Sequence, residues 1–218
     1  MRRWTLGLVI LSVVLLSAVM AQQFTFNLIE NFENDNGALN SSKWWHFGDV
    51  RAEVMRNPST EARDLVAESC GEYSLHLAGS AKNWYVGGVG TELGIDASKY
   101  SRIQIDIYGH NNFSGKLVIE LYDDDNHNWT IETDSQNNYL PLYDDKWVAE
   151  VLIQGEGLTR VSIPFSAFRL ANSGVGNGIW DPKQIDSSGG LLKLQLVAIA
   201  DKSDSKVDFS VDNILLTY

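Results

Sequence analysis

The sequence predicts an all-β protein, a two-sheet antiparallel β-sandwich of the jelly-roll type, preceded by the helix of a signal peptide. Three observations support this fold class. Segments in which apolar and polar residues alternate follow one another along the chain, as expected for strands that bury one face. Turn-forming residues separate these segments. Beyond residue 21, no long segment repeats with the 3.6-residue period of an amphipathic helix.

Seven segments carry the alternating pattern most clearly. In residues 102–107, for example, three isoleucines alternate with Arg102, Gln104 and Asp106, so that one face of the segment is apolar. Turns rich in Asn, Asp, Ser and Gly are expected between such segments. The expected strands cover residues 24–28, 73–77, 102–107, 116–121, 159–163, 192–197 and 207–214, and the clearest turns cover residues 35–37, 112–115 and 188–190.

The first 21 residues are organised like a secretory signal peptide. Arg2 and Arg3 precede an apolar run from Trp4 to Leu16, and small residues follow up to Ala21. Cleavage is expected after Ala21, so that residues 22–218 form one domain of a secreted protein, extracellular, periplasmic or at the cell surface, with no membrane contact. The alternative is an uncleaved anchor, because the apolar stretch approaches the roughly 18 residues needed to span a bilayer.

Charge and composition exclude several classes of function. The formal net charge is −11 at pH 7, which disfavours nucleic acid and anionic membranes as partners. The single cysteine, Cys70, leaves no intrachain disulfide. The four histidines lack the paired spacing of a zinc site, and no nucleophile elbow, Walker loop or dinucleotide fingerprint occurs. An acidic exported protein of this kind suits neutral ligands or cations.

Several aromatic residues stand beside polar turn residues rather than inside alternating segments. Sugar rings pack their C–H faces on aromatic planes, while Asp, Asn, Arg or His at the rim binds the hydroxyls. These aromatic residues therefore indicate a carbohydrate-binding surface, although about two thirds of them are expected to pack in the core. The groups lie at residues 44–47, 83–85, 127–129, 146–147 and 180–182.

Acidic residues leave two questions open. The clusters at residues 123–126 and 144–145 fall in predicted loops. They are typical of Asx turns on a solvated surface, and their oxygens would also suit calcium, although the spacing is not that of an EF-hand. Glu120 and Glu150, each in a predicted strand, could be the paired carboxyl groups of a small jelly-roll glycosidase. Strand glutamates on a solvated face are the commoner case.

Four short motifs, taken in order, resemble family 11 carbohydrate-binding modules, which belong to the wider galactose-binding-like jelly-roll group. They are Glu-Asn-Phe-Glu at residues 30–33, Trp-Tyr-Val-Gly at 84–87, Ile-Pro-Phe-Ser-Ala-Phe-Arg at 163–169 and Val-Asp-Asn-Ile at 211–214. The resemblance covers nearly all of the chain after residue 21. It implies a two-sheet jelly roll that holds a β-glucan chain on a concave aromatic face and binds structural calcium.

The resemblance also implies roles for particular residues. Glu33 and Asp212 match acidic positions of the family's calcium-binding region. Phe47 falls where the family has an early aromatic after a Trp, and Tyr85 matches a tyrosine in the family's Tyr-Trp-Gly segment; both are expected to bind the ligand. Asp124 with His127 reproduces an Asp-x-x-His pair that contacts the sugar. Two departures stand out: residues 170–173 replace the family's Arg, Asp and Tyr, and residues 192–200 lack its ligand-facing tyrosine. Trp84 and Trp180 are the expected replacements for the missing aromatics.

Three functions are compatible with these observations. The first is a secreted, non-catalytic protein that binds a β-glucan-type polysaccharide. The second is a self-associating structural subunit of a cell-surface layer or extracellular filament, with residues 22–31 as a strand for a neighbour's open sheet edge. The third is a glycosidase that uses Glu120 and Glu150. We rank them in this order.

Overall fold

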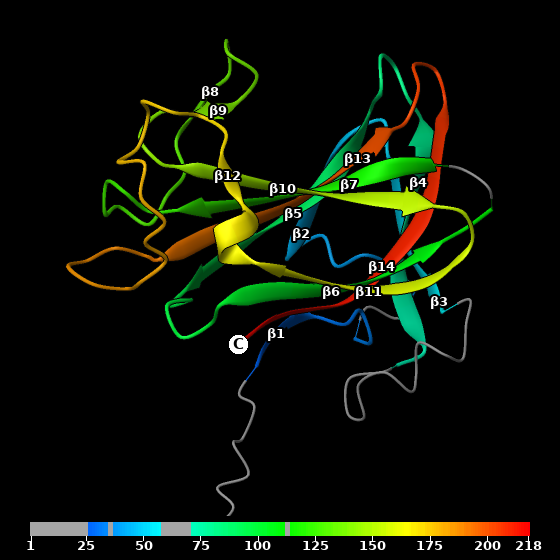
Figure 1. Ribbon diagram of the computed structural model, residues 1–218, viewed down its shortest axis with the longest axis horizontal. Coiled ribbons are helices and arrows are strands. Elements are labelled where there is room, and N and C mark those ends of the chain that lie inside the picture. Colours follow the sequence, from blue (N-terminus) through cyan, green and yellow to red (C-terminus); the bar gives the residue numbers. More distant parts are fainter. Residues whose placement is uncertain (1–25, 35–36, 58–70, 112–113) are drawn as a thin grey trace, which may run out of the picture.

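The protein is an antiparallel β-sandwich, which confirms the predicted fold class. The computed structural model describes residues 26–34, 37–57, 71–111 and 114–218. Two six-stranded sheets face each other, and a small two-stranded sheet lies beside them (Figure 1). The predicted signal peptide, residues 1–21, lies outside the described residues.

The first sheet, called sheet A here, has the strand order β11-β6-β14-β4-β3, with β1 paired to β14 as well. All of its pairs are antiparallel. The pairing of β1 with β14 joins the beginning of the described chain to its end, as Figure 1 shows. The strands are β1 (Asn27–Glu30), β3 (Arg51–Arg56), β4 (Tyr73–Ser80), β6 (Arg102–Gly109), β11 (Gly157–Pro164) and β14 (Lys206–Thr217).

The second sheet, called sheet B, has the order β12-β10-β7-β13-β5-β2 and is also antiparallel. Its strands are β2 (Trp44–Gly48), β5 (Tyr85–Ile95), β7 (Ser114–Asp123), β10 (Lys146–Gln154), β12 (Arg169–Leu170) and β13 (Leu191–Ala200). The short hairpin of β8 (Thr133–Asp134) and β9 (Leu140–Pro141) lies between β7 and β10 in the chain. A 3-10 turn covers Phe165–Ala167.

The core fills the space between the two sheets, because each strand turns its apolar residues to the same side. From sheet A, Ile105 of β6 and Phe209 of β14 belong to this core, and both are 1% exposed. From sheet B, Ile119 of β7 and Leu194 and Leu196 of β13 are completely buried in it. The residues that alternate with them along β7 and β13 therefore lie on the outer face of sheet B.

Each of the seven expected strands overlaps a strand of the structure, although the N-terminal one is displaced. That segment was expected at 24–28, of which residues 24 and 25 lie outside the described residues; β1 begins at Asn27, and Phe26 is exposed. Several strands were not expected, among them β2 and β5, because their aromatic and glycine-rich sequences lack clear alternation. Within the described residues no helix is long and apolar enough to cross a membrane.

Candidate ligand-binding groove

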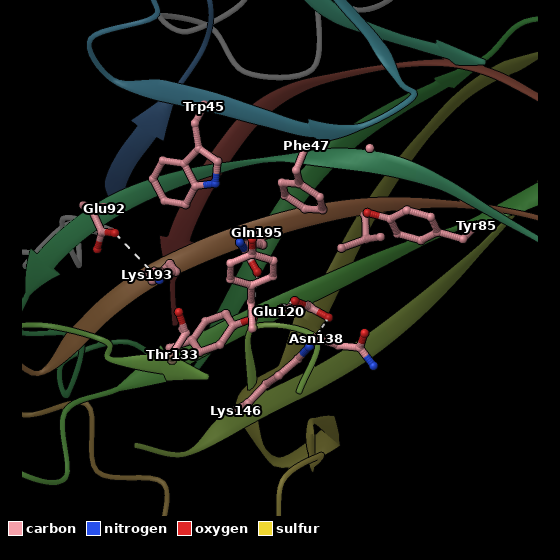
Figure 2. A pocket seen from close by; sticks show the side chains of 14 residues that line it. Trp45, Phe47, Tyr85, Glu92, Glu120, Thr133, Asn138, Lys146, Lys193 and Gln195 are labelled. Carbon is pink, nitrogen blue, oxygen red and sulfur yellow. Dashed lines mark hydrogen bonds and ion pairs between the residues drawn. The ribbon is translucent and has the colours of Figure 1, made fainter. Parts of the chain in front are cut away.

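A groove of about 640 Å³ runs across the outer face of sheet B (Figure 2). Five strands supply its floor, and the β8–β9 hairpin supplies one wall. Volumes of this size are typical of ligand sites. The lining residues are Trp45, Phe47, Gly48, Tyr85, Glu92, Glu120, Tyr122, Thr133, Asn138, Tyr139, Lys146, Lys193, Gln195 and Val197.

Two aromatic rings of β2 form a platform in this groove. Trp45 pairs with Gly90 of β5, and Phe47 pairs with Gly88. A Cβ atom at Gly90 would lie 2.4 Å from the Trp45 ring, and one at Gly88 would lie 2.7 Å from the Phe47 ring. The rings therefore lie on the bare backbone of β5, and the glycines are needed there because any side chain would lift the rings away.

A hydrogen-bonded group occupies the centre of the groove floor. The Tyr122 hydroxyl donates to Glu120 Oε2 at 2.7 Å and also lies 2.7 Å from Gln195 Oε1. Lys146 Nζ forms an ion pair with Glu120 Oε1 at 2.5 Å (Figure 2). Burial, together with the charge of Glu120, raises the pKa of the Tyr122 hydroxyl, which therefore stays protonated as a donor.

Lys193 stands at one end of the platform, with Tyr85 at the other (Figure 2). The Lys193 ammonium lies 5.7 Å from the centre of the Trp45 ring and 5.3 Å from the centre of the Tyr122 ring, which is within cation–π range. Glu92 is its carboxylate neighbour, at 3.8 Å. Burial lowers the pKa of Lys193, and the charge of Glu92 opposes this shift.

The charges of the groove cancel, unlike those of the whole chain. Two lysines and two glutamates are the charged residues of its lining, whereas the chain has a formal net charge of −11. The groove therefore combines stacking rings with hydrogen-bonding groups and no net charge. This combination suits a neutral polyhydroxylated ligand rather than an ionic one.

Two of the predicted ligand residues, Phe47 and Tyr85, line the groove. Trp84, although it precedes Tyr85, is not part of the lining described above. It lies in the turn between β4 and β5 with a φ of +72°, and its ring is half exposed. Its backbone carbonyl accepts the N–H of Ala200.

Asp124 and His127 also lie outside the groove lining. Asp124 is 2% exposed, and its carboxylate accepts the backbone N–H groups of Asn128, Trp129 and Gly189. It therefore ties together the two loops that follow β7 and precede β13. The His127 ring is exposed, and its Nδ1 lies 2.8 Å from a backbone carbonyl oxygen of the second loop.

Trp180 packs at the edge of the core rather than in the groove. Its ring centre lies 5.0 Å from that of Phe165 and 5.9 Å from that of Trp147.

The candidate carboxyl pair, Glu120 and Glu150, does not meet in the groove. Glu120 lines it, whereas Glu150 contacts Lys116 and Arg169 outside its lining. The two glutamates therefore have different partners and different surroundings.

Sequence reasoning missed most of the polar groove residues. Lys193 and Gln195 alternate with buried leucines along β13, and this alternation was a usable signal that both face outward. Nothing in the sequence showed that β7 lies between β13 and β10, which brings Tyr122 and Glu120 beside them. Trp45 and Lys146 fell within the aromatic groups at 44–47 and 146–147 but were not assigned to the ligand, and the other polar and aromatic lining residues without a predicted role are Glu92, Tyr122, Thr133, Asn138, Tyr139, Lys193 and Gln195.

The predicted calcium residues, Glu33 and Asp212, are neighbours in the structure. Burial, followed by the charges of Asp106 and Glu33, raises the pKa of Asp212 to about 7. The Glu33 carboxylate accepts the backbone N–H groups of Glu72 and Tyr73, each at 2.9 Å. Glu33 thus connects the segment after β1 to the beginning of β4.

Asn57 lies among the oxygens of the same region. Its Nδ2 is 3.2 Å from each of three oxygens: Asp212 Oδ2 and the carbonyls of Gly71 and Tyr73. Oxygens that converge on one point fit a calcium ion if Asn57 turns its amide oxygen toward it.

Comparison with solved structures finds the same fold in carbohydrate-binding modules. The family 11 module of the cellulosomal cellulase Lic26A-Cel5E of Clostridium thermocellum is 17% identical, with 88% of this chain and 94% of that chain covered and a TM-score of 0.53. A family 11 module from Clostridium thermocellum in complex with a β-1,3-1,4-mixed-linked tetrasaccharide is 16% identical with the same coverage and TM-score. An exo-β-agarase is 15% identical over 88% of this chain and 25% of that chain, with a TM-score of 0.54.

The chain matches no model of a protein family, and a search of curated proteins finds no match. At such low identities, the structural likeness is evidence for the fold alone. It confirms the similarity that the four sequence motifs indicated: this chain has the β-sandwich fold of family 11 carbohydrate-binding modules.

Proposed function

We propose that this protein is a secreted, non-catalytic carbohydrate-binding protein that holds a β-glucan-type polysaccharide in the groove of sheet B. The observation that carries the proposal is the platform of Trp45 and Phe47, whose rings lie on the backbone at Gly90 and Gly88. Flat apolar surfaces of this kind match the C–H faces of pyranose rings.

The polar groups beside the platform support the same ligand class. Glu120, Gln195 and Lys146 offer acceptors and donors within one connected group, which can exchange partners with sugar hydroxyls. The absence of net charge among the lining residues favours a neutral chain over a uronic-acid or sulfated one. A β-glucan is the first choice of ligand because a similarly folded family 11 module was solved with a β-1,3-1,4-mixed-linked tetrasaccharide.

Binding without hydrolysis is supported by the position of the candidate acids. A glycosidase places two carboxyl groups across the scissile bond. Of the pair Glu120 and Glu150, only Glu120 lines the groove, and Glu150 is held by Lys116 and Arg169. The signal-peptide pattern of residues 1–21 supports secretion. Structural calcium at Glu33 and Asp212 remains part of the proposal.

The test is affinity electrophoresis of the secreted protein through β-1,3-1,4-mixed-linked glucan, followed by a reducing-sugar assay. We expect retardation and no released sugar. Trp45→Ala should lower the affinity roughly 5- to 150-fold, because losing a stacking ring costs about 1 to 3 kcal/mol. Circular dichroism checks that the variant is folded.

Trp84→Ala is the matched control, since Trp84 is a half-exposed tryptophan outside the groove lining. Its affinity should stay within about twofold of the parent. Loss of affinity in Trp84→Ala but not in Trp45→Ala would place the ligand at the β4–β5 turn instead. Failure of the parent to bind any glucan of a broad panel would move our preference to the structural subunit.

A further inference from the structure

Three aspartates from two segments of the chain meet at one end of sheet B, away from the platform. Asp123 ends β7, Asp125 follows two residues later, and Asp145 directly precedes β10. One carboxylate oxygen from each lies within 4.8 Å of the others. Asp123 and Asp145 are both 0% exposed. The loop that joins β12 to β13 runs to the same end of the molecule (Figure 1).

Two buried oxygens of this cluster have no hydrogen-bond partner. Asp125 Oδ1 and Asp145 Oδ1 are inaccessible to solvent and unpaired. The other oxygens of the same two side chains are satisfied: Asp145 Oδ2 accepts the N–H of Gly178 at 2.6 Å, and Asp125 Oδ2 accepts that of Asp145 at 2.8 Å. A buried unpaired acceptor normally costs about 1 to 3 kcal/mol, more when it is charged. These two oxygens therefore lack a positively charged partner.

No side chain of the described residues supplies that charge. None of the ion pairs formed there by Lys, Arg or His includes Asp123, Asp125 or Asp145. Asp181 adds a further negative charge nearby.

The β12–β13 loop closes over the cluster with its backbone. A Cβ atom at Gly176 would lie 2.0 Å from Asp125 Oδ2 and 2.5 Å from Asp145 Oδ1. Only glycine allows the chain to pass this close to both carboxylates. The loop also donates backbone N–H groups to Asp123 and to Asp145. The three segments thus form an enclosed site lined by oxygen atoms.

We propose that Asp123, Asp125 and Asp145 form a divalent-cation site of the type that calcium occupies. Carboxylate oxygens with no nitrogen or sulfur donor select hard cations, and calcium tolerates irregular loop geometry better than magnesium does. This site is separate from the one proposed at Glu33 and Asp212, since Asp212 lies on β14 of sheet A.

A cation at this site should also affect the groove, and this second inference rests on the proposed function. Tyr122 directly precedes Asp123, and Lys146 directly follows Asp145. Both residues hold Glu120 in the groove floor. A cation that fixes the two aspartates therefore fixes the chain on either side of this group, and its removal should weaken polysaccharide binding.

Terbium luminescence tests the site in the purified secreted protein after treatment with chelator. Trp147 Nε1 donates to Asp123 Oδ1 at 2.9 Å, so an ion bound here lies within energy-transfer distance of an indole. We expect terbium emission on tryptophan excitation that calcium displaces. Asp145→Asn and Asp125→Asn should each raise the calcium concentration that is needed to half-saturate the site at least about tenfold. Asp212→Asn should leave this concentration within about twofold of the parent value.

Each outcome decides the proposal. The absence of calcium-displaceable emission in the parent protein, or emission unchanged in folded Asp125→Asn, would overturn it. Asp125 is only partly buried, so this variant keeps the test valid if Asp145→Asn does not fold. The titration contains no sugar; calcium binding without glucan binding would therefore keep the cation site and reject the proposed function.

Discussion

The outer faces of the two sheets use the same kinds of residues for different purposes. On sheet A, Arg160 donates to both oxygens of Asp106, from Nε and Nη2, each at 2.7 Å, and Asn213 Nδ2 adds a third contact at 2.9 Å. On sheet B, Lys193 stands over two rings with its carboxylate neighbour 3.8 Å away. In the network on sheet A, the donors and acceptors satisfy one another. In the groove on sheet B, charged and aromatic groups remain able to contact a ligand.

The difference shows that burial of a charge does not by itself indicate function. Asp106 is 1% exposed, yet each of its oxygens has a donor within the protein. Lys193 is similarly buried, with 11% of its side chain exposed, but its surroundings form a groove that a ligand can enter. We therefore expect substitutions in the Asp106 network of sheet A to change stability and substitutions in the groove of sheet B to change affinity.

The largest expected effect is that of Asp106→Ala. This variant removes the bidentate acceptor of Arg160 from a pair in which the Asp106 side chain is 1% exposed, and breaking such a buried pair costs about 3 to 5 kcal/mol of unfolding free energy. Urea unfolding followed by tryptophan fluorescence measures the loss. The remaining folded protein should bind glucan as tightly as the parent.

Trp45→Ala provides the opposite case in the same assays. It should lose affinity while its urea midpoint changes much less than that of Asp106→Ala. If Asp106→Ala costs less than about 1 kcal/mol, or if it reduces affinity as much as Trp45→Ala does, the division between a structural and a binding face is wrong.

Calcium at Glu33 and Asp212 should stabilise the protein without affecting the groove. These residues join the ends of the described chain, where β1 pairs with β14. A cation at about 100 times its Kd would add about 2.7 kcal/mol to the unfolding free energy. Melting curves in calcium and in chelator measure this gain. The Asp145→Asn background isolates this site from the one at the end of sheet B.

In that background, Asp212→Asn should abolish the calcium effect on the melting temperature. Melting curves of Asp145→Asn that coincide in calcium and chelator would show that Glu33 and Asp212 hold no ion. In that case Asn57, whose amide nitrogen lies among the same oxygens, is the permanent partner of Asp212.

The features that could be predicted from the sequence are those whose pattern lies within one short segment of the chain. Alternation is local, so the strands around Ile105 and Leu194 were found, and with them the sandwich. The strand β2 was not, because Trp45 and Phe47 lie opposite glycines of the neighbouring strand rather than against apolar side chains. That pairing is visible only once β2 and β5 are side by side.

The site illustrates the same limit. Asp124 matches a family position in the sequence, but its side chain turns into the loops to accept three backbone N–H groups. The orientation of one side chain among three consecutive aspartates depends on where the loop leaves β7, which no spacing reveals. Phe47 and Tyr85, which the resemblance matched to aromatics of the family, both line the groove from β2 and β5.

The smallest expected effect, that of Glu150→Gln, sharpens the comparison within sheet B itself. Glu150 lies on the same sheet as Glu120 but binds Lys116 and Arg169 at the surface. Exposed pairs of this kind contribute about 0 to 1 kcal/mol, so stability should change by no more than that. Affinity for glucan should not change, because Glu150 is outside the groove lining. Reducing-sugar release should be absent before and after the substitution. Measurable hydrolysis that Glu150→Gln abolishes would instead mean that the two glutamates act together, and the groove would be the active site of a glycosidase.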